Sequence, residues 1–179
     1  RGDGTTLTQV AREGQAAPGG NGSFLGFNGS TLNDAGQVAF RGDLTGTSGG
    51  PSDDSGIFRG DGTTLTQVAR EGQAAPDGNG SLSSFNIPTL NAAGQAAFLG
   101  VLTGTSGGSS DDGGTFRGDG TTLTQVAREG QAAPGGNGSF SLFGGPALND
   151  AGQAAFRGFL TGTSGGTSDD GGIFRGDGT

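Results

Sequence analysis

The 179-residue sequence has no histidine, cysteine, lysine, tyrosine, tryptophan or methionine. It therefore lacks the usual general base, the thiolate nucleophile, the Schiff-base amine, and the imidazole and sulfur ligands of transition metals. A serine nucleophile would have no histidine to activate it. The only glutamates, Glu13, Glu71 and Glu129, occupy equivalent positions, whereas a glycosidase needs two carboxylates in unlike environments. We therefore expect a protein that is not an enzyme.

Basic charge and long apolar runs are also scarce. Nine arginines face 17 acidic residues, which gives a net charge of −8. Charge of this sign disfavours nucleic acid and anionic membranes as partners. No apolar run approaches the roughly 18 residues of a membrane-spanning helix, so no membrane span is predicted. The chain starts and stops within the same Arg-Gly-Asp-Gly-Thr string, and we expect a longer repetitive polypeptide around it.

Glycine, at 43 positions, and internal repetition are what the sequence has in abundance. A 58-residue unit runs three times, over 1–58, 59–116 and 117–174, and residues 175–179 start a fourth. Self-similarity at a fixed period indicates a solenoid, a propeller or an array. One unit has too few large apolar side chains to offset the conformational entropy of ordering its own backbone. Neighbouring units must therefore share a core.

The local patterns favour strands over helices. A strand is predicted over 37–44, where Val38, Phe40 and Leu44 alternate onto one face. The turn string at 33–36 joins this strand to the preceding apolar piece as a hairpin, and a second hairpin crosses each unit boundary at an Asp-Gly turn. We expect an all-β fold of tandem repeats, each a four-stranded antiparallel sheet, in an open array or as part of a β-propeller.

Three segments resemble known repeat motifs. Residues 32–40, L-N-D-A-G-Q-V-A-F, resemble the S-P-D-G-x-x-I-A-F blade motif of bacterial six-bladed propellers, and residues 56–62 look like the hairpin that follows it. Residues 109–116 are similar to the sialidase Asp-box, S-x-D-x-G-x-T-W, with Phe116 in place of tryptophan. The whole unit resembles the tandem repeats of secreted choice-of-anchor bacterial proteins. These resemblances imply blade-like sheets, an exported protein, and an Asp-box that braces a hairpin without a catalytic role.

Paired aspartates recur in one glycine-rich loop of every unit. The six residues are Asp53, Asp54, Asp111, Asp112, Asp169 and Asp170. Hard cations favour flexible oxygen ligands of this kind, so the pairs are candidate ligands for calcium, the one cofactor that the sequence offers. The alternative is a solvated aspartate turn that braces a hairpin. No Asp-x-Asp-x-Asp-Gly string accompanies the pairs.

Two further surfaces are candidates for modification or binding. The Asn-Gly-Ser sequence that N-glycosylation requires begins at Asn21, Asn28, Asn79 and Asn137. Asn-Gly is also a common turn pair, which is the alternative for these sites.

Positions 41 and 43 form the second surface, on the strand face opposite Phe40. Arginine and aspartate in the first unit become Leu99 and Val101 in the second, and the third has Phe159. These three could form an apolar patch that docks a neighbouring chain. Drift on an exposed face is the alternative.

These observations predict a structural extracellular or cell-surface protein, a segment of a filament or stalk that self-associates through stacked β repeats. Identical units and polar loops suit a role that depends on length. The alternative is a propeller binding module for a glycan or protein ligand, completed by further blades or by oligomerisation. The lack of tryptophan and tyrosine, on which sugars stack, weighs against that alternative.

Overall fold

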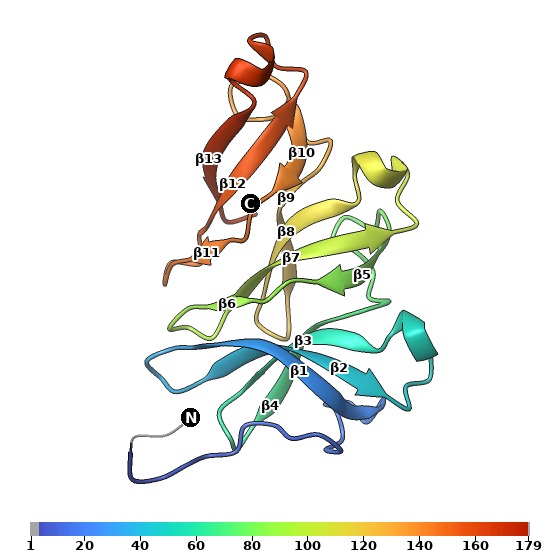
Figure 1. Ribbon diagram of the computed structural model, residues 1–179, viewed down its shortest axis with the longest axis vertical. Coiled ribbons are helices and arrows are strands. Elements are labelled where there is room, and N and C mark those ends of the chain that lie inside the picture. The colour runs from blue at the N-terminus through green and yellow to red at the C-terminus, as the bar shows by residue number, and fades with distance from the viewer. Residues whose placement is uncertain (1–3, 179) are drawn as a thin grey trace.

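The computed structural model describes residues 4–178, which form three open antiparallel β-sheets joined by loops (Figure 1). Three short 3-10 turns are the only helical elements in these residues: η1 (Gly50–Ser52), η2 (Gly108–Ser110) and η3 (Gly166–Ser168). No helix in the described range has the length and apolar character that crossing a bilayer requires. The all-β prediction is confirmed.

Each sheet is a meander of strands in chain order. The first contains β1 (Ser23–Leu32), β2 (Val38–Thr45), β3 (Ser55–Gly60) and β4 (Leu65–Arg70). The second contains β5 (Ser81–Phe85), β6 (Thr89–Leu90), β7 (Ala96–Thr103), β8 (Gly113–Gly118) and β9 (Leu123–Arg128). The third contains β10 (Ser139–Phe143), β11 (Ala147–Leu148), β12 (Ala154–Thr161) and β13 (Gly171–Gly176).

The two predicted hairpins are both present in the first sheet. β1 pairs with β2, with Leu32 opposite Val38, and β3 pairs with β4 across the boundary between the first two units. The first strand is longer than the short apolar piece that the sequence predicts. Its counterparts β5 and β6 follow one another along the same edge of β7, so the edge strand of the second sheet is interrupted. Pro88, which cannot donate to a β ladder, lies in the interruption.

The sheets stack as layers because each has apolar side chains on both faces. On one face of β2, Phe40 joins Phe24 and Phe58 in a cluster. On the opposite face, Ala39 and Ile57 belong to a second cluster. The remaining buried members of this second cluster come from β4, from the loop after it and from the second sheet: Val68, Ala69, Ala75, Leu82, Phe85, Ala96, Phe98, Leu102 and Phe116. The first and second sheets therefore share one core.

The second and third sheets pack in the same way. Ala127 lies in a cluster with Phe140, Phe143 and Phe156, and Leu99 packs against it. Each sheet thus presents phenylalanines toward the preceding layer and smaller side chains toward the following one. Figure 1 shows the three layers following one another along the longest axis of the molecule. Sharing a core between layers resolves the shortage of apolar side chains in a single unit.

Glycine allows the phenylalanine rings to lie directly on the strands. A Cβ on the buried Gly42 would lie 2.8 Å from Phe24 Cε1 and 3.1 Å from Phe58 Cδ2. These two rings form an edge-to-face pair with centroids 5.0 Å apart. Glycine in a strand interior is normally unfavourable, and here the close approach of the rings explains it.

Replacing Gly42 with alanine should therefore destabilise the protein, by about 1–3 kcal/mol, because the added methyl group overpacks the ring pair. Gly26→Ala is the matched control, since no heavy atom lies within 4 Å of a Cβ at that position. We expect the control to change the free energy of unfolding by less than about 0.5 kcal/mol. Chemical denaturation of the three proteins measures both values, and equal stabilities for the two variants would contradict the ring-on-glycine packing.

Candidate functional site

The first aspartate of each pair is hydrogen-bonded to its own loop and to an asparagine of another loop. Asp53 Oδ2 accepts a 2.7 Å hydrogen bond from Asn21 Nδ2, and Asp53 Oδ1 accepts one of 3.2 Å from the Gly49 amide. The side-chain hydrogen bond from Thr47, more than any other interaction, holds the pKa of Asp53 below its usual value. The bond from asparagine recurs at 2.8 Å in the other two loops, from Asn79 to Asp111 and from Asn137 to Asp169.

These contacts give the aspartates and asparagines a bracing role. Asn21 Oδ1 also accepts a 2.8 Å bond from the Ser48 amide, so one side chain joins two glycine-rich loops. Glycosylation at these asparagines stays a prediction, and a glycan on Asn21 would replace a hydrogen of the nitrogen that bonds to Asp53. Asn28 lies on β1, where it donates to Asp43 at 2.7 Å. No three acidic side chains among residues 4–178 converge as metal ligands would. Calcium binding by the paired aspartates stays a prediction.

The second aspartates of the first two loops, Asp54 and Asp112, lie beside glutamates. Burial raises the pKa of Glu71, and a hydrogen bond with the Asp54 carboxyl raises it further. Glu129 is only 9% exposed, and its neighbour Asp112 is the counterpart of Asp54. Burial is again the largest cause of the raised pKa of Glu129. Glu129 Oε2 accepts a 2.9 Å hydrogen bond from the Gly113 amide. Asp170 is the counterpart of these aspartates in the third sheet, and its carbonyl accepts from Leu160 N at 2.7 Å.

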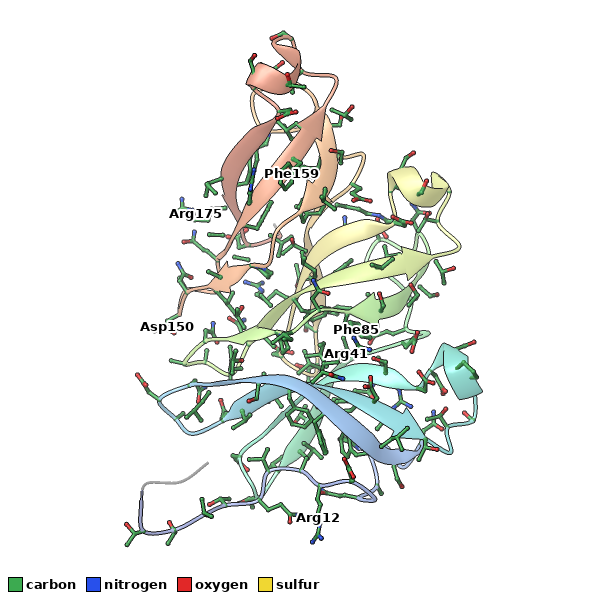
Figure 2. The ribbon with its side chains drawn as sticks, viewed as in Figure 1. Arg12, Arg41, Phe85, Asp150, Phe159 and Arg175 are labelled. Carbon is green, nitrogen blue, oxygen red and sulfur yellow. The ribbon has the colours of Figure 1, made fainter. Side chains whose placement is uncertain are left out.

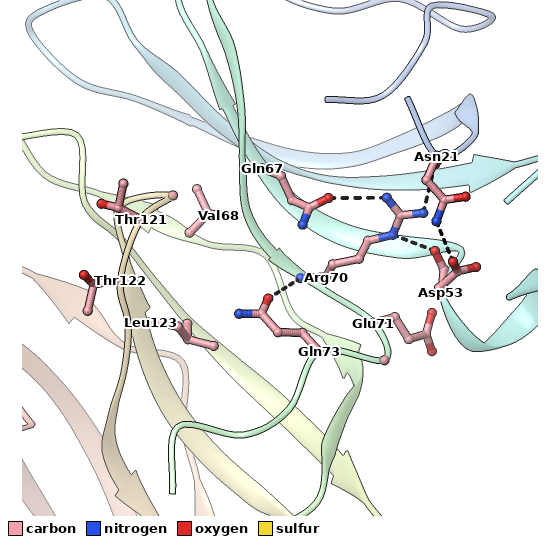
Figure 3. Close-up of a pocket in the computed structure, with 12 residues that line it drawn as sticks. Asn21, Asp53, Gln67, Val68, Arg70, Glu71, Gln73, Thr121, Thr122 and Leu123 are labelled. Atoms are coloured by element: carbon pink, nitrogen blue, oxygen red, sulfur yellow. Dashed lines mark hydrogen bonds between the residues drawn. The ribbon is translucent and has the colours of Figure 1, made fainter. Parts of the chain in front are cut away.

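A buried arginine pins each of the first two aspartate loops to the strand beside it. Arg70 Nε donates to the Asp53 carbonyl at 2.6 Å, and Arg70 Nη2 donates to the Asn21 carbonyl at 3.1 Å (Figure 3). Burial lowers the pKa of Arg70. A cavity of about 430 Å³ separates this arginine from the hairpin turn that contains Thr121 and Thr122 in the next sheet (Figure 3). Arg70 acts here through hydrogen bonds within the chain.

Arg128 repeats this arrangement with one additional partner. It donates to the carbonyls of Asp111 and Asn79 at 2.6 and 2.8 Å. Arg128 Nη1 also forms an ion pair with Asp77 Oδ2, at 2.8 Å. Asp77 takes the place of Gly19 in the first unit. The second loop therefore has an ion pair that the first loop lacks.

Equivalent asparagines form a ladder across the three sheets. Asn33 Nδ2 donates to the Asn91 carbonyl at 2.8 Å, and Asn91 Nδ2 donates to the Asn149 carbonyl at 2.9 Å, in both cases over 58 residues. Each asparagine also accepts a hydrogen bond at Oδ1 from the backbone amide four residues later, as Asn91 does from Gln95 at 2.8 Å. Asn91 is 3% exposed. A buried amide that bonds both within its own turn and to the adjacent layer fixes the register between sheets.

The residues predicted as an apolar patch do not lie together. Leu99 and Val101 line a cavity of about 320 Å³ between the second and third sheets. Phe159 lies on β12 in the third sheet, where the guanidinium carbon of Arg157 is 4.2 Å from its ring centroid. Leu99 thus contributes to a contact within the chain, whereas Val101 is 44% exposed. Docking of another chain on these residues stays a prediction.

Sequence reasoning missed the asparagine ladder and the buried arginines. The turn string at 33–36 is sufficient to predict a hairpin. No local pattern distinguishes an asparagine that only caps a turn from one that also bonds to the next layer. The available signal is the recurrence of the same asparagine at the repeat period, at 33, 91 and 149. Arg70 and Arg128 are the last residues of β4 and β9. Their burial depends on loops that lie far away in the sequence, so the strand pattern alone does not reveal it.

The fold and these contacts define an all-β protein of stacked open sheets with hydrogen-bonded side chains between the layers. The chain belongs to DUF7453, a family of unknown function, whose model matches residues 1–179. No curated protein matches the chain, and no solved structure does. The resemblances to propeller blades, the Asp-box and choice-of-anchor repeats remain expectations.

Removing the central rung of the ladder should destabilise the stack. Asn91→Ala leaves the Gln95 amide and the Asn149 carbonyl without their side-chain partner in a buried place, at a cost of about 1–3 kcal/mol. Asn149→Ala is the matched control, because Asn149 is exposed and its side chain bonds only within its own turn, to Gln153. Thermal unfolding of both variants checks this. Equal losses would show that the contact between layers adds nothing.

Proposed function

We propose that the chain is a structural module in which stacked β repeats add length to an extracellular filament or surface stalk. The observation that carries the proposal is that equivalent residues of successive sheets meet one another in the same way. The asparagine ladder is one such contact. Arginine provides another, since Arg59 Nη1 donates to the Gly94 carbonyl and Arg117 Nη1 donates to the Gly152 carbonyl. A contact that recurs at a constant interval can be extended without limit.

The hairpin turns supply a third recurring contact. Thr66 lies against Gly120 so closely that a Cβ on the glycine would overlap the threonine methyl group. The same pair recurs as Thr8 with Gly62 and as Thr124 with Gly178. These glycines have φ between 83° and 98°, which side chains rarely adopt, so the turn requires glycine for two reasons. Residues 7–12 repeat the sequence of β4 and occupy the corresponding place beside the first sheet.

The outer face of the third sheet supports extension of the stack. Ile57 is fully buried where the second sheet covers the first, whereas its equivalent Ile173 is 78% exposed. Figure 2 places Arg175, the equivalent of Arg59 and Arg117, on this same sheet. A further unit of the same sequence would bury the isoleucine and supply a carbonyl for the arginine. We therefore propose a repeat of this chain, in the same or another molecule, as the partner.

A closed β-propeller is the alternative architecture for the same contacts, since blades are also four-stranded meanders. In that case the function would be a binding module for a glycan or protein ligand. Both proposals include export from the cell and attached glycans. The Asn-Gly-Ser sites and the polar, glycine-rich loops support these two properties in either case.

A chain of six units distinguishes the two architectures. We expect its maximum dimension in small-angle X-ray scattering to be about twice that of the 179-residue chain, because an open stack grows in proportion to its number of layers. The 179-residue chain itself is the control for the dimension per unit. Discrete rings in electron micrographs, with a dimension that hardly exceeds that of three units, would overturn the filament and favour the propeller.

A further inference from the structure

One difference between the two contacts between sheets is a cavity. Between the second and third sheets there is a cavity of about 320 Å³. Its lining combines apolar side chains with two acidic ones, and includes Leu99, Val101, Leu142, Phe143, Asp112 and Glu129. A concave site with mostly apolar walls and a few convergent polar groups is typical of small-molecule binding. Glu129 is 9% exposed, so a carboxyl group lies largely out of solvent beside this cavity.

The equivalent place between the first and second sheets is filled by the side chain of Arg41. Arg41 Nη1 donates to the Phe85 carbonyl of the second sheet at 3.2 Å, and its Nε donates to Ser55 Oγ at 3.3 Å. Arg41 Nη2 contacts Asp43 Oδ1 at 3.1 Å. Figure 2 shows Arg41 and Phe85 next to each other between these two sheets.

Every residue in this group has a counterpart 58 positions later that lines the cavity. Leu99 replaces Arg41, Gly113 replaces Ser55, and Phe143 is the counterpart of Phe85. The replacements shorten or remove the polar side chains, which leaves space where the guanidinium lies in the first contact.

The acidic pair is retained although the cation is lost. Glu71 and Asp54 of the first contact correspond to Glu129 and Asp112 of the second. Burial and Asp54 raise the pKa of Glu71, and the positive charge of Arg41 acts in the opposite direction. Burial raises the pKa of Glu129, and the nearby carboxyls of Asp112 and Asp111 raise it further. A carboxylate held away from water without a cation is costly, and the partner of Glu129 in the second contact is the Gly113 amide, where Glu71 of the first contact has the positive charge of Arg41 nearby.

We propose that the cavity between the second and third sheets binds a small organic cation, a guanidinium or ammonium group on a short apolar body. The cationic head takes the place of the Arg41 guanidinium, close to Glu129, Asp112 and the Phe143 carbonyl. The apolar body contacts Leu99, Val101 and Leu142. The site is independent of whether the stack forms a filament, because all of its residues belong to one chain.

Calorimetric titration of the 179-residue chain with butylguanidinium tests this inference. We expect saturable binding at one site per chain. Butylurea has the same shape without the charge, and it should bind at least tenfold more weakly. Absence of saturable binding by butylguanidinium would overturn the proposal, and so would equal affinities for the two compounds, since a purely apolar cavity does not discriminate between them.

Variants at the cavity locate the site. Leu99→Arg supplies the missing guanidinium from the chain itself and should abolish binding, whereas Leu25→Arg, on the 61% exposed Leu25 of β1, should leave it unchanged. Glu129→Gln should lower the affinity at least tenfold. Binding that is unaffected by Leu99→Arg would place the ligand elsewhere and contradict the assignment. Thermal unfolding of each variant confirms that loss of binding is not loss of the fold.

The first contact provides a gain-of-function test. The double variant Arg41→Leu with Ser55→Gly gives the first contact the two replacements that open the second. We expect it to bind two butylguanidinium ions per chain. If the double variant unfolds at the same temperature as the parent and still binds one ion, Arg41 is not the equivalent of the ligand and the inference fails.

Discussion

The apolar side chains on both faces of the sheets are the constraint on which the rest of the structure depends. Each sheet carries phenylalanines on one face and alanine, isoleucine or leucine on the other, so a sheet on its own would expose two apolar faces. Stacking the phenylalanine face of one layer on the aliphatic face of the preceding one removes both from water. Glycines at positions such as Gly42 allow the rings to approach the strands. The high glycine content thus has a packing explanation within the sheets.

Apolar packing alone does not fix how far one layer is displaced along the next, and polar side chains supply that information. Asn91 donates to the next layer and receives its own hydrogen bond from the preceding one, which is satisfied only in a single register. The buried Arg70 and Arg128 tie the long aspartate loops to the sheet edges. Because these groups are buried, an incorrect register would leave them unpaired. The glycine-rich loops are therefore ordered through side chains that lie far away in the sequence.

Much of the fold could be predicted from the sequence, because strands and tight turns leave local signals. The alternation at 38–44 and the Asp-Gly turns predict β2 and the hairpin of β3 with β4. The candidate site could not be predicted in this way. Whether Asp53 binds a cation or braces a loop depends on Asn21, 32 residues away, and whether Leu99 faces solvent or a cavity depends on the third sheet. These contacts follow from how the layers stack, which no local pattern encodes.

Hydrogen exchange at two glutamine amides tests the layered account most directly. The Gln95 and Gln153 amides both donate at 2.8 Å to the asparagine four residues earlier, but only Asn91 is buried between layers. The local bond is the same, so a difference in exchange reports the covering layer. The account predicts that the Gln95 amide exchanges at least about tenfold more slowly than the Gln153 amide. Equal exchange rates would contradict the claim that stacking between sheets holds this fold together.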